Sequence, residues 1–181
     1  MLTDFKRKSI PFLERSIGTD WDWLALAQHH GLATRLLDWT LNPLAALWFV
    51  VGKPPVNKGA GVVWVFEPAK DDFVIPSDQT NPFTGRRTKV FQPNHITARI
   101  VSQGGWFTVH KYMVDKSRFI PMEKNARLMK CLTKAIIPAN SFADLRAELD
   151  RYGVNSALLF PGLDGLCSYI EWMNSLLEDE S

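Results

Sequence analysis

The sequence has little cysteine, little net charge and no long apolar run, and each shortage excludes a class of protein. Its two cysteines, Cys131 and Cys167, stand without a Cys-x-x-Cys spacing, which argues against a zinc ribbon or a disulfide scaffold and suits a reducing compartment. The 21 basic and 19 acidic residues leave a net charge of +2, so bulk charge does not favour nucleic acid. The longest apolar run, Leu44 to Val51, has eight residues, whereas a bilayer span needs about 20. No apolar stretch follows the charges of the first ten residues, which argues against a secretory signal and predicts a cytoplasmic protein without membrane contact.

Common catalytic patterns are missing as well. The sequence contains no dinucleotide-binding Gly-x-Gly-x-x-Gly, no phosphate-binding P-loop, no His-Glu-x-x-His and no Gly-x-Ser-x-Gly. No carboxylate or cysteine stands at metal-ligand spacing from the neighbouring His29 and His30. We therefore predict no metal site and no required cofactor.

The length of 181 residues fits one domain with its own core. Capping residues and apolar periodicity predict helices over 20–30, 42–51 and 142–152 and after Pro161, with strands over 61–67, 96–102, 105–110, 132–137 and 156–160. Residues 68–95 are proline-rich and read as a long irregular segment. Because the elements show no regular βαβ alternation, the fold class is α+β, with a mixed or antiparallel sheet and buried helices. We assign 1–18 as an N-terminal arm and 19–178 as one domain.

Burial patterns refine this prediction. The helix Pro43–Val51 is apolar on nearly all sides and is predicted to be buried, as is the strand 61–67. The last helix places Leu166, Ile170, Met173 and Leu177 along one side, which predicts a packing face. Seven tryptophans are present, and most of them, including Trp48 and Trp64, are read as core residues.

The first polar cluster runs from Gln28 to Thr40, between two apolar helices. Arg35 and Asp38 are three residues apart, so one reading is a structural ion pair. The other reading is that Arg35 faces an anionic ligand such as a phosphate while Asp38 orients it. His29 and His30 are adjacent and point about 100° apart on a helix, so at most one of them faces a cleft. Thr40 is read either as part of a helix cap or as a site hydroxyl.

The second polar cluster runs from Arg99 to His110 around Gly104 and Gly105. Strand alternation would place Arg99, Val101 and Gln103 on one face. This pattern is typical of an edge strand with a solvent-facing side, or of a strand whose backbone approaches a ligand closely.

Three blocks of the sequence resemble the FRG domain, a family of bacteria and their phages that takes its name from a Phe-Arg-Gly motif. The first block is QHHGLATRLLDWT with the following Asn42-Pro43 and the helix to Phe49, and it is highly specific. The second and third blocks are Arg99 to His110 and Leu159 to Leu166. Two departures stand out: Ala33 replaces the usual proline, and no Phe-Arg-Gly precedes Gln28. The resemblance therefore implies a domain that lacks its first strand.

A weaker resemblance links the same blocks to ADP-ribosyltransferases that use an Arg, a hydroxyl-bearing strand and a later Glu. It implies an NAD substrate, with Thr40 at the hydroxyl position and Gln103 in place of the acid. The catalytic residues that it implies are Arg35, Asp38, Thr40 and Gln103. From the two polar clusters we further predict ligand-binding residues: Gln28, His30, Trp39, Arg99, Trp106, Phe107 and His110.

Other functions account for the same residues. One alternative is a non-catalytic module that recognises a protein or a nucleotide-like ligand. Another is a truncated domain stabilised as a homo-oligomer, because a missing strand leaves a sheet edge open to pairing. Nucleic acid is a weak candidate partner, since the basic residues Arg86, Arg87 and Lys89 near Phe91 also suit a solvated loop.

Overall fold

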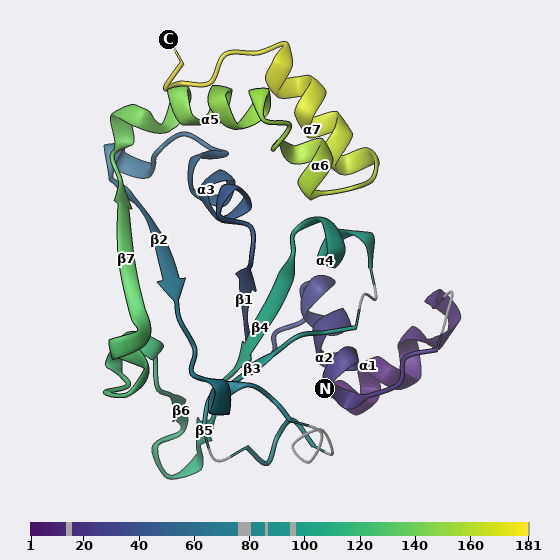
Figure 1. Cartoon of the computed structure of the whole chain (residues 1–181). Helices are drawn as coiled ribbons and strands as arrows, with labels where there is room; N and C mark the ends of the chain where they lie inside the picture. The colour runs from purple at the N-terminus through teal and green to yellow at the C-terminus, as the bar shows by residue number, and fades with distance from the viewer. Residues whose placement is uncertain (14–15, 76–80, 86, 95–96, 181) are drawn as a thin grey trace. The chain divides into compact units, whose positions relative to one another are not determined.

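The computed structural model describes residues 1–13, 16–75, 81–85, 87–94 and 97–180 (Figure 1). Helices and small antiparallel sheets confirm the predicted α+β class. Two compact units emerge from the contacts. Unit 1 consists of Met1–Trp39, Pro68–Ile100 and Gly105–Lys130, and unit 2 of Thr40–Glu67, Val101–Gly104 and Cys131–Ser181. The two units alternate along the sequence, so no single linker separates them.

Unit 1 contains helices α1 (Leu2–Ser9) and α2 (Asp20–His29). The predicted start of α2 is confirmed, because the Thr19 hydroxyl accepts a hydrogen bond from the backbone nitrogen of Asp22 at 3.2 Å. A glycine at φ +80°, Gly31, follows the end of the helix, as predicted. The core of this unit is formed by Trp21, Leu24, Ala25, Leu36, Phe91, Phe107 and Val109.

A three-stranded sheet contributes to that core, with strand order β1-β4-β3. The strands are β1 (Leu36–Thr40), β3 (Lys89–Phe91) and β4 (Gly105–Val109). β3 runs antiparallel to β4, with Phe91 opposite Phe107. β4 confirms the predicted strand at 105–110, whereas β1 was not predicted because its residues show no clean period. A separate short hairpin pairs β5 (Tyr112–Met113) with β6 (Arg118–Phe119).

The predicted strand at 96–102 is wrong. Residues Ala98–Ser102 form the short helix α4, in which the Thr97 hydroxyl accepts a hydrogen bond from the backbone nitrogen of Ile100 at 3.3 Å. This threonine cap favours a helical turn over an extended segment. Arg99, Val101 and Gln103 therefore do not share a strand face. Ile96 lies outside the described residues.

Unit 2 contains helices α3 (Pro43–Val51), α5 (Phe142–Arg151), α6 (Ser156–Leu159) and α7 (Leu163–Met173). β2 (Gly61–Phe66) pairs antiparallel with β7 (Leu132–Ile137), with Gly61 opposite Ile137, and the two strands lie side by side in Figure 1. Both strands were predicted. Six buried residues form the core: Ala45, Val51, Phe142, Leu149, Val154 and Leu159.

The start of α3 follows the Asn-Pro prediction. The Asn42 side chain accepts hydrogen bonds from the backbone nitrogens of Leu44 and Ala45, at 3.0 and 3.4 Å. Pro43 occupies the first turn, where no backbone N–H is needed. The predicted burial on all sides is wrong, because only Ala45 and Val51 are buried and Phe49 is 50% exposed.

Two further burial predictions are corrected. β2 belongs to a two-stranded ribbon that leaves Trp64 43% exposed, so this tryptophan is not a core residue. The predicted packing face of the last helix is largely open, with Leu166, Ile170 and Met173 exposed. An amphipathic pattern identifies the apolar face of a helix but not the surface that covers it.

The predicted strand at 156–160 is wrong as well. The Asn155 side chain accepts a hydrogen bond from the backbone nitrogen of Leu158 at 3.1 Å and thereby starts the short helix α6. An apolar run of this length fits a strand or a buried helical turn equally well, and the cap favours the helix. Among the described residues, no helix has the length and apolar character needed to cross a membrane.

Candidate functional site

In unit 1, side chains of the segment that follows α2 form hydrogen bonds that link the end of α2 to β1. The Thr34 hydroxyl donates to Gln28 Oε1 at 2.6 Å and accepts from the backbone nitrogen of Leu36 at 3.0 Å. Because Gln28 Oε1 faces Thr34, its amide nitrogen is free to donate to Asp38 Oδ2, at 3.4 Å. These bonds fix the turn that follows α2, so Gln28 and Asp38 both have structural partners.

The carboxyl of Asp38 is exposed but lies in crowded surroundings. This desolvation raises the pKa of Asp38, while the Gln28 hydrogen bond and the positive charge of Arg99 oppose the rise. The predicted ion pair with Arg35 does not form.

Arg35 has weaker partners than a buried arginine usually finds. Its Nη1 lies 3.5 Å from the Pro82 carbonyl and 3.4 Å from the Phe83 carbonyl, and its guanidinium lies 4.8 Å from the centre of the Phe83 ring. In the described part of the chain, no carboxylate forms an ion pair with it. Burial without an anion lowers the pKa of Arg35 from its ordinary value.

A small pocket of about 180 Å³ adjoins Arg35 in unit 1. Its wall is mostly apolar and includes Leu24, Leu32, Phe83 and Phe119. The guanidinium is the charged side chain that lines it, so the pocket combines one cation with an apolar surface.

Trp39 and His110 are joined by a buried hydroxyl. Trp39 Nε1 donates to Thr108 Oγ1 at 3.0 Å, and this oxygen lies 3.0 Å from His110 Nε2. Since Thr108 is fully buried and already accepts from Trp39, its own proton is available for a neutral His110. Sequence reasoning missed Thr108, because a threonine in a strand gives no signal of burial.

Stability at mildly acidic pH is expected to depend on His110. Burial lowers its pKa below the ordinary 6.5, and a backbone hydrogen bond with Ile120 only partly offsets this. The unfolded chain therefore takes up a proton at a higher pH than the folded chain does. The free energy of unfolding should fall as the pH drops from about 6.5 through the lowered pKa, by about 1.4 kcal/mol for each pKa unit of difference.

Urea unfolding of the parent and of His110→Gln, each measured from about pH 7.5 to about pH 5, checks this expectation. The variant should lose part of the pH dependence, because glutamine does not titrate. His29 needs its own control, His29→Gln, since burial and the charges of His30 and Arg99 lower its pKa too. An identical pH slope in the parent and in His110→Gln would contradict the role assigned to His110.

The two remaining catalytic candidates lie in unit 2. The Thr40 hydroxyl donates to the backbone carbonyl of Gln103 at 2.6 Å and accepts from the backbone nitrogen of Asn42 at 2.9 Å. The Gln103 side chain donates to the carbonyl of Leu159 at 3.0 Å. Both side chains thus connect segments of unit 2, and Thr40 also supports the start of α3, as one sequence reading expected.

The other predicted ligand-binding residues lie apart from Arg35 in their contacts. His30 is exposed at the end of α2, with its ring edge-on to His29 at 4.8 Å. Trp106 packs edge-on against Phe73 at 5.9 Å. Phe107 is 4% exposed and belongs to the core, so its predicted ligand contact is not supported. Arg99 lies on α4 and is half-buried.

The basic cluster offers little free charge for a nucleic acid. Arg87 forms an ion pair with Asp71 at 2.9 Å, and Lys89 donates to the carbonyls of Asp71 and Phe73. Arg127 pairs with Asp72 at 2.5 Å. Arg86 lies outside the described residues. No group of three or more His, Cys, Asp or Glu side chains in the described ranges could hold a metal ion.

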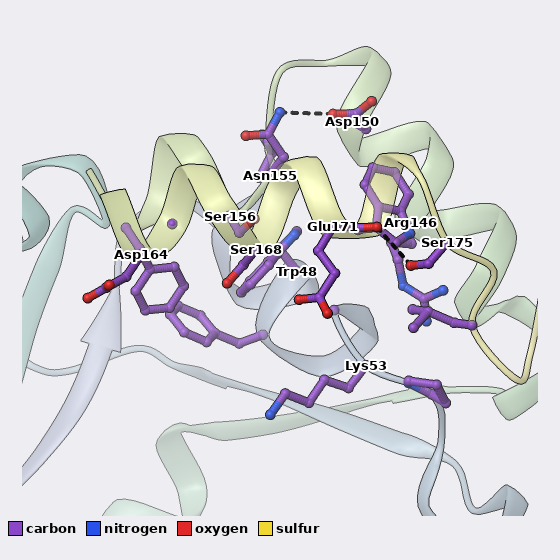
Figure 2. Close-up of a pocket in the computed structure, with 18 residues that line it drawn as sticks. Trp48, Lys53, Arg146, Asp150, Asn155, Ser156, Asp164, Ser168, Glu171 and Ser175 are labelled. Carbon is purple, nitrogen blue, oxygen red and sulfur yellow. Dashed lines mark hydrogen bonds between the residues drawn. The ribbon is translucent and has the colours of Figure 1, made fainter. Parts of the chain in front are cut away.

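A larger cavity, of about 840 Å³, lies within unit 2 (Figure 2). It is bounded by α3 and the C-terminal helices and has a mixed aromatic and charged lining. Sequence reasoning missed it, because it read Trp48 as a core residue and the last helix only by its apolar side.

Part of the chain is similar to a known protein family. The FRG domain matches residues 1–58, which include the whole first block from Gln28 to Phe49. This match confirms the predicted resemblance over that block, and it does not extend to Arg99–His110 or Leu159–Leu166. No curated protein and no solved structure shows significant similarity to the chain.

Proposed function

On the premise that residues 1–58 resemble the FRG domain, we propose that this protein is a non-catalytic module that recognises a nucleotide-like anion through Arg35. The observation that carries the proposal is a half-buried guanidinium with only two long carbonyl contacts and no carboxylate partner among the described residues. NAD is the candidate ligand that the weaker ADP-ribosyltransferase resemblance suggests.

Electrostatics supports an anion at Arg35. Partial burial removes water from the guanidinium, and the lowered pKa of Arg35 reflects that loss. A phosphate or pyrophosphate oxygen would restore strong charge-assisted hydrogen bonds at the uncommitted nitrogens. Asp38 forms no ion pair with Arg35; its carboxylate accepts a hydrogen bond from the Gln28 amide.

The adjoining pocket of about 180 Å³ sets the size of the recognised group. It fits one small apolar or aromatic group beside the anion, with Phe83 and Phe119 as ring partners. A nucleotide supplies both parts, because its base is flat and its phosphate is charged. The pocket is too small for a whole dinucleotide, so we expect only part of NAD to be enclosed.

The geometry favours binding of a nucleotide over transfer of an ADP-ribosyl group. ADP-ribosyl transfer would need Thr40 and Gln103 near the reacting ribose. Their side chains already hold the Gln103 and Leu159 carbonyls at 2.6 and 3.0 Å. Gln103 also carries no negative charge to stabilise an oxocarbenium-like transition state.

Calorimetric titration with NAD, ADP and inorganic pyrophosphate tests the proposal on the parent and on Arg35→Gln. Loss of a charge-assisted contact should weaken binding about 10- to 100-fold, since such hydrogen bonds are worth about 1.5–3 kcal/mol. Arg151→Gln is the matched control, because Arg151 is an exposed arginine that pairs with Glu148. Thermal unfolding checks that each variant is folded.

Three outcomes would overturn the proposal. They are no saturable binding of any of these anions at millimolar concentration, equal binding by the parent and Arg35→Gln, and release of nicotinamide from NAD by the parent. The last outcome would favour the enzyme reading instead.

A further inference from the structure

The cavity of unit 2 has a wall of three aromatic rings. Trp48 and Phe49 come from α3, and Phe160 follows α6. Trp48 lies 5.6 Å from Phe49 and 5.7 Å from Phe160, and Phe49 lies 5.9 Å from Phe160, measured between ring centres. The rings are inclined to one another by 56–82°, so the wall offers both ring faces and ring edges to an occupant.

Part of the polar lining of the cavity comes from one face of α7. Asp164, Ser168 and Glu171 stand at positions i, i+4 and i+7 of that helix, which places them on one side. Figure 2 shows Glu171 reaching down from α7 on the side where Lys53 lies, with Ser168 near Trp48. The apolar side of α7, with Leu166 and Ile170, is a different face.

Two other charged groups of the lining have partners within unit 2. Arg146 pairs with Asp179 at 2.9 Å and also with Glu180. Asp150 accepts from the Asn155 amide at 2.8 Å and from Tyr169. Lys53, Asp164 and Glu171 form no ion pair in the part of the chain that the structure describes. The uncommitted charges therefore leave the cavity with one net negative charge.

We propose that this cavity binds an organic cation, an ammonium or guanidinium group carried on an apolar or aromatic body. The aromatic wall attracts a cation through its ring faces, most strongly through the indole of Trp48. The carboxylates of Asp164 and Glu171 supply the complementary charge, and an anion would meet an excess of negative charge. The volume of about 840 Å³ lies within the range of about 300–1,000 Å³ typical of small-molecule sites.

This site is independent of the one proposed at Arg35. It belongs to unit 2, shares no residue with the pocket in unit 1, and takes a ligand of the opposite charge. Failure of either proposal leaves the other standing.

Three compounds that share the indole ring and differ in the charge of a short side chain test the proposal on the whole protein. Tryptamine carries an ammonium group, tryptophol a neutral hydroxyl and indole-3-acetate a carboxylate. Calorimetry should give the tightest binding for tryptamine, by about tenfold over tryptophol, and no saturable binding for indole-3-acetate. The indole N–H signal of Trp48, assigned with Trp48→Phe, should shift on titration.

Conservative variants test which side chains supply the negative charge of the cavity. Glu171→Gln and Asp164→Asn should each weaken tryptamine binding about fivefold and leave tryptophol binding unchanged. Lys53→Gln should strengthen it, because a competing positive charge is removed. Glu148→Gln, an exposed carboxylate on α5 outside the cavity, is the control and should have no effect.

Equal affinity for tryptamine and indole-3-acetate would overturn the inference. So would unchanged tryptamine binding in the Asp164→Asn, Glu171→Gln double variant, or no saturable tryptamine binding at millimolar concentration. The substitutions at Lys53, Glu148, Asp164 and Glu171 fall on exposed side chains, so loss of the fold does not obscure the result.

Discussion

Replacement of Gly165 by alanine is expected to disrupt the packing of α7 against α6. A β-carbon at this position would lie 2.0 Å from the Phe160 carbonyl oxygen and 2.6 Å from the Ser156 carbonyl oxygen. Backbone atoms cannot rotate out of the way as side chains do, so the helices must separate. We expect a loss of about 3 kcal/mol or more in the free energy of unfolding.

Hydrogen exchange of peptides that cover α6 and α7 measures this effect locally, and urea unfolding measures it globally. Protection in those peptides should fall sharply in Gly165→Ala. Gly18→Ala is the control, because a β-carbon there would meet nothing within 4 Å. If Gly165→Ala were as stable as the parent, the close approach of the two helices would be wrong.

The second large effect is expected at Arg146, which is only 3% exposed. Its Nε donates to the Val51 carbonyl at 2.8 Å, and its Nη atoms pair with Asp179 and Glu180. Arg146→Met preserves most of the side-chain volume but leaves a carbonyl and two carboxylates without their cation. Breaking such a buried pair from one side costs about 3–5 kcal/mol.

Arg151→Met provides the comparison on the same helix. Arg151 is exposed and pairs with Glu148 at 3.4 Å, so its loss should change the stability by no more than about 0.5 kcal/mol. Equal urea midpoints for Arg146→Met and the parent would contradict the buried network.

Acidic pH gives a second readout for Arg146→Met. Burial by itself would raise the pKa of Glu180, but hydrogen bonds from Trp172, Leu177 and Arg146 outweigh it and lower the pKa. In the variant that lacks Arg146, the carboxylates of Asp179 and Glu180 repel each other, and their protonation at low pH removes this repulsion. The stability gap between the variant and the parent should therefore narrow as the pH falls below about 5.

Local signals predicted several elements well. The Thr19 cap and the Asn42-Pro43 pair gave the starts of α2 and α3, because each cap bonds within three residues. Alternating or apolar runs gave β2, β4 and β7. The strands predicted at 96–102 and 156–160 were wrong. A short apolar run fits a strand or a helical turn equally well, and the side-chain caps at Thr97 and Asn155 favour the helix.

The candidate site was likewise predicted only in part from the sequence. Sequence resemblance selected Gln28, Arg35, Asp38 and Thr40 together, but it did not separate structural roles from binding roles. Hydrogen bonds assign Gln28, Asp38 and Thr40 to holding α2, β1 and α3. Arg35 is left with two long carbonyl contacts, which is why the binding proposal rests on it.

The sequence by itself determined the α+β class, most helix starts and the resemblance to the FRG domain, because these depend on caps, periodicity and a contiguous block. Tertiary structure alone decided the burial of Thr108 and Arg146, the open face of α7 and the cavity between α3 and α7. Those features join residues up to 95 positions apart, such as Arg146 and Val51. Burial and hydrogen-bond partners depend on such distant contacts, and no local pattern records which side chains the folded chain brings together.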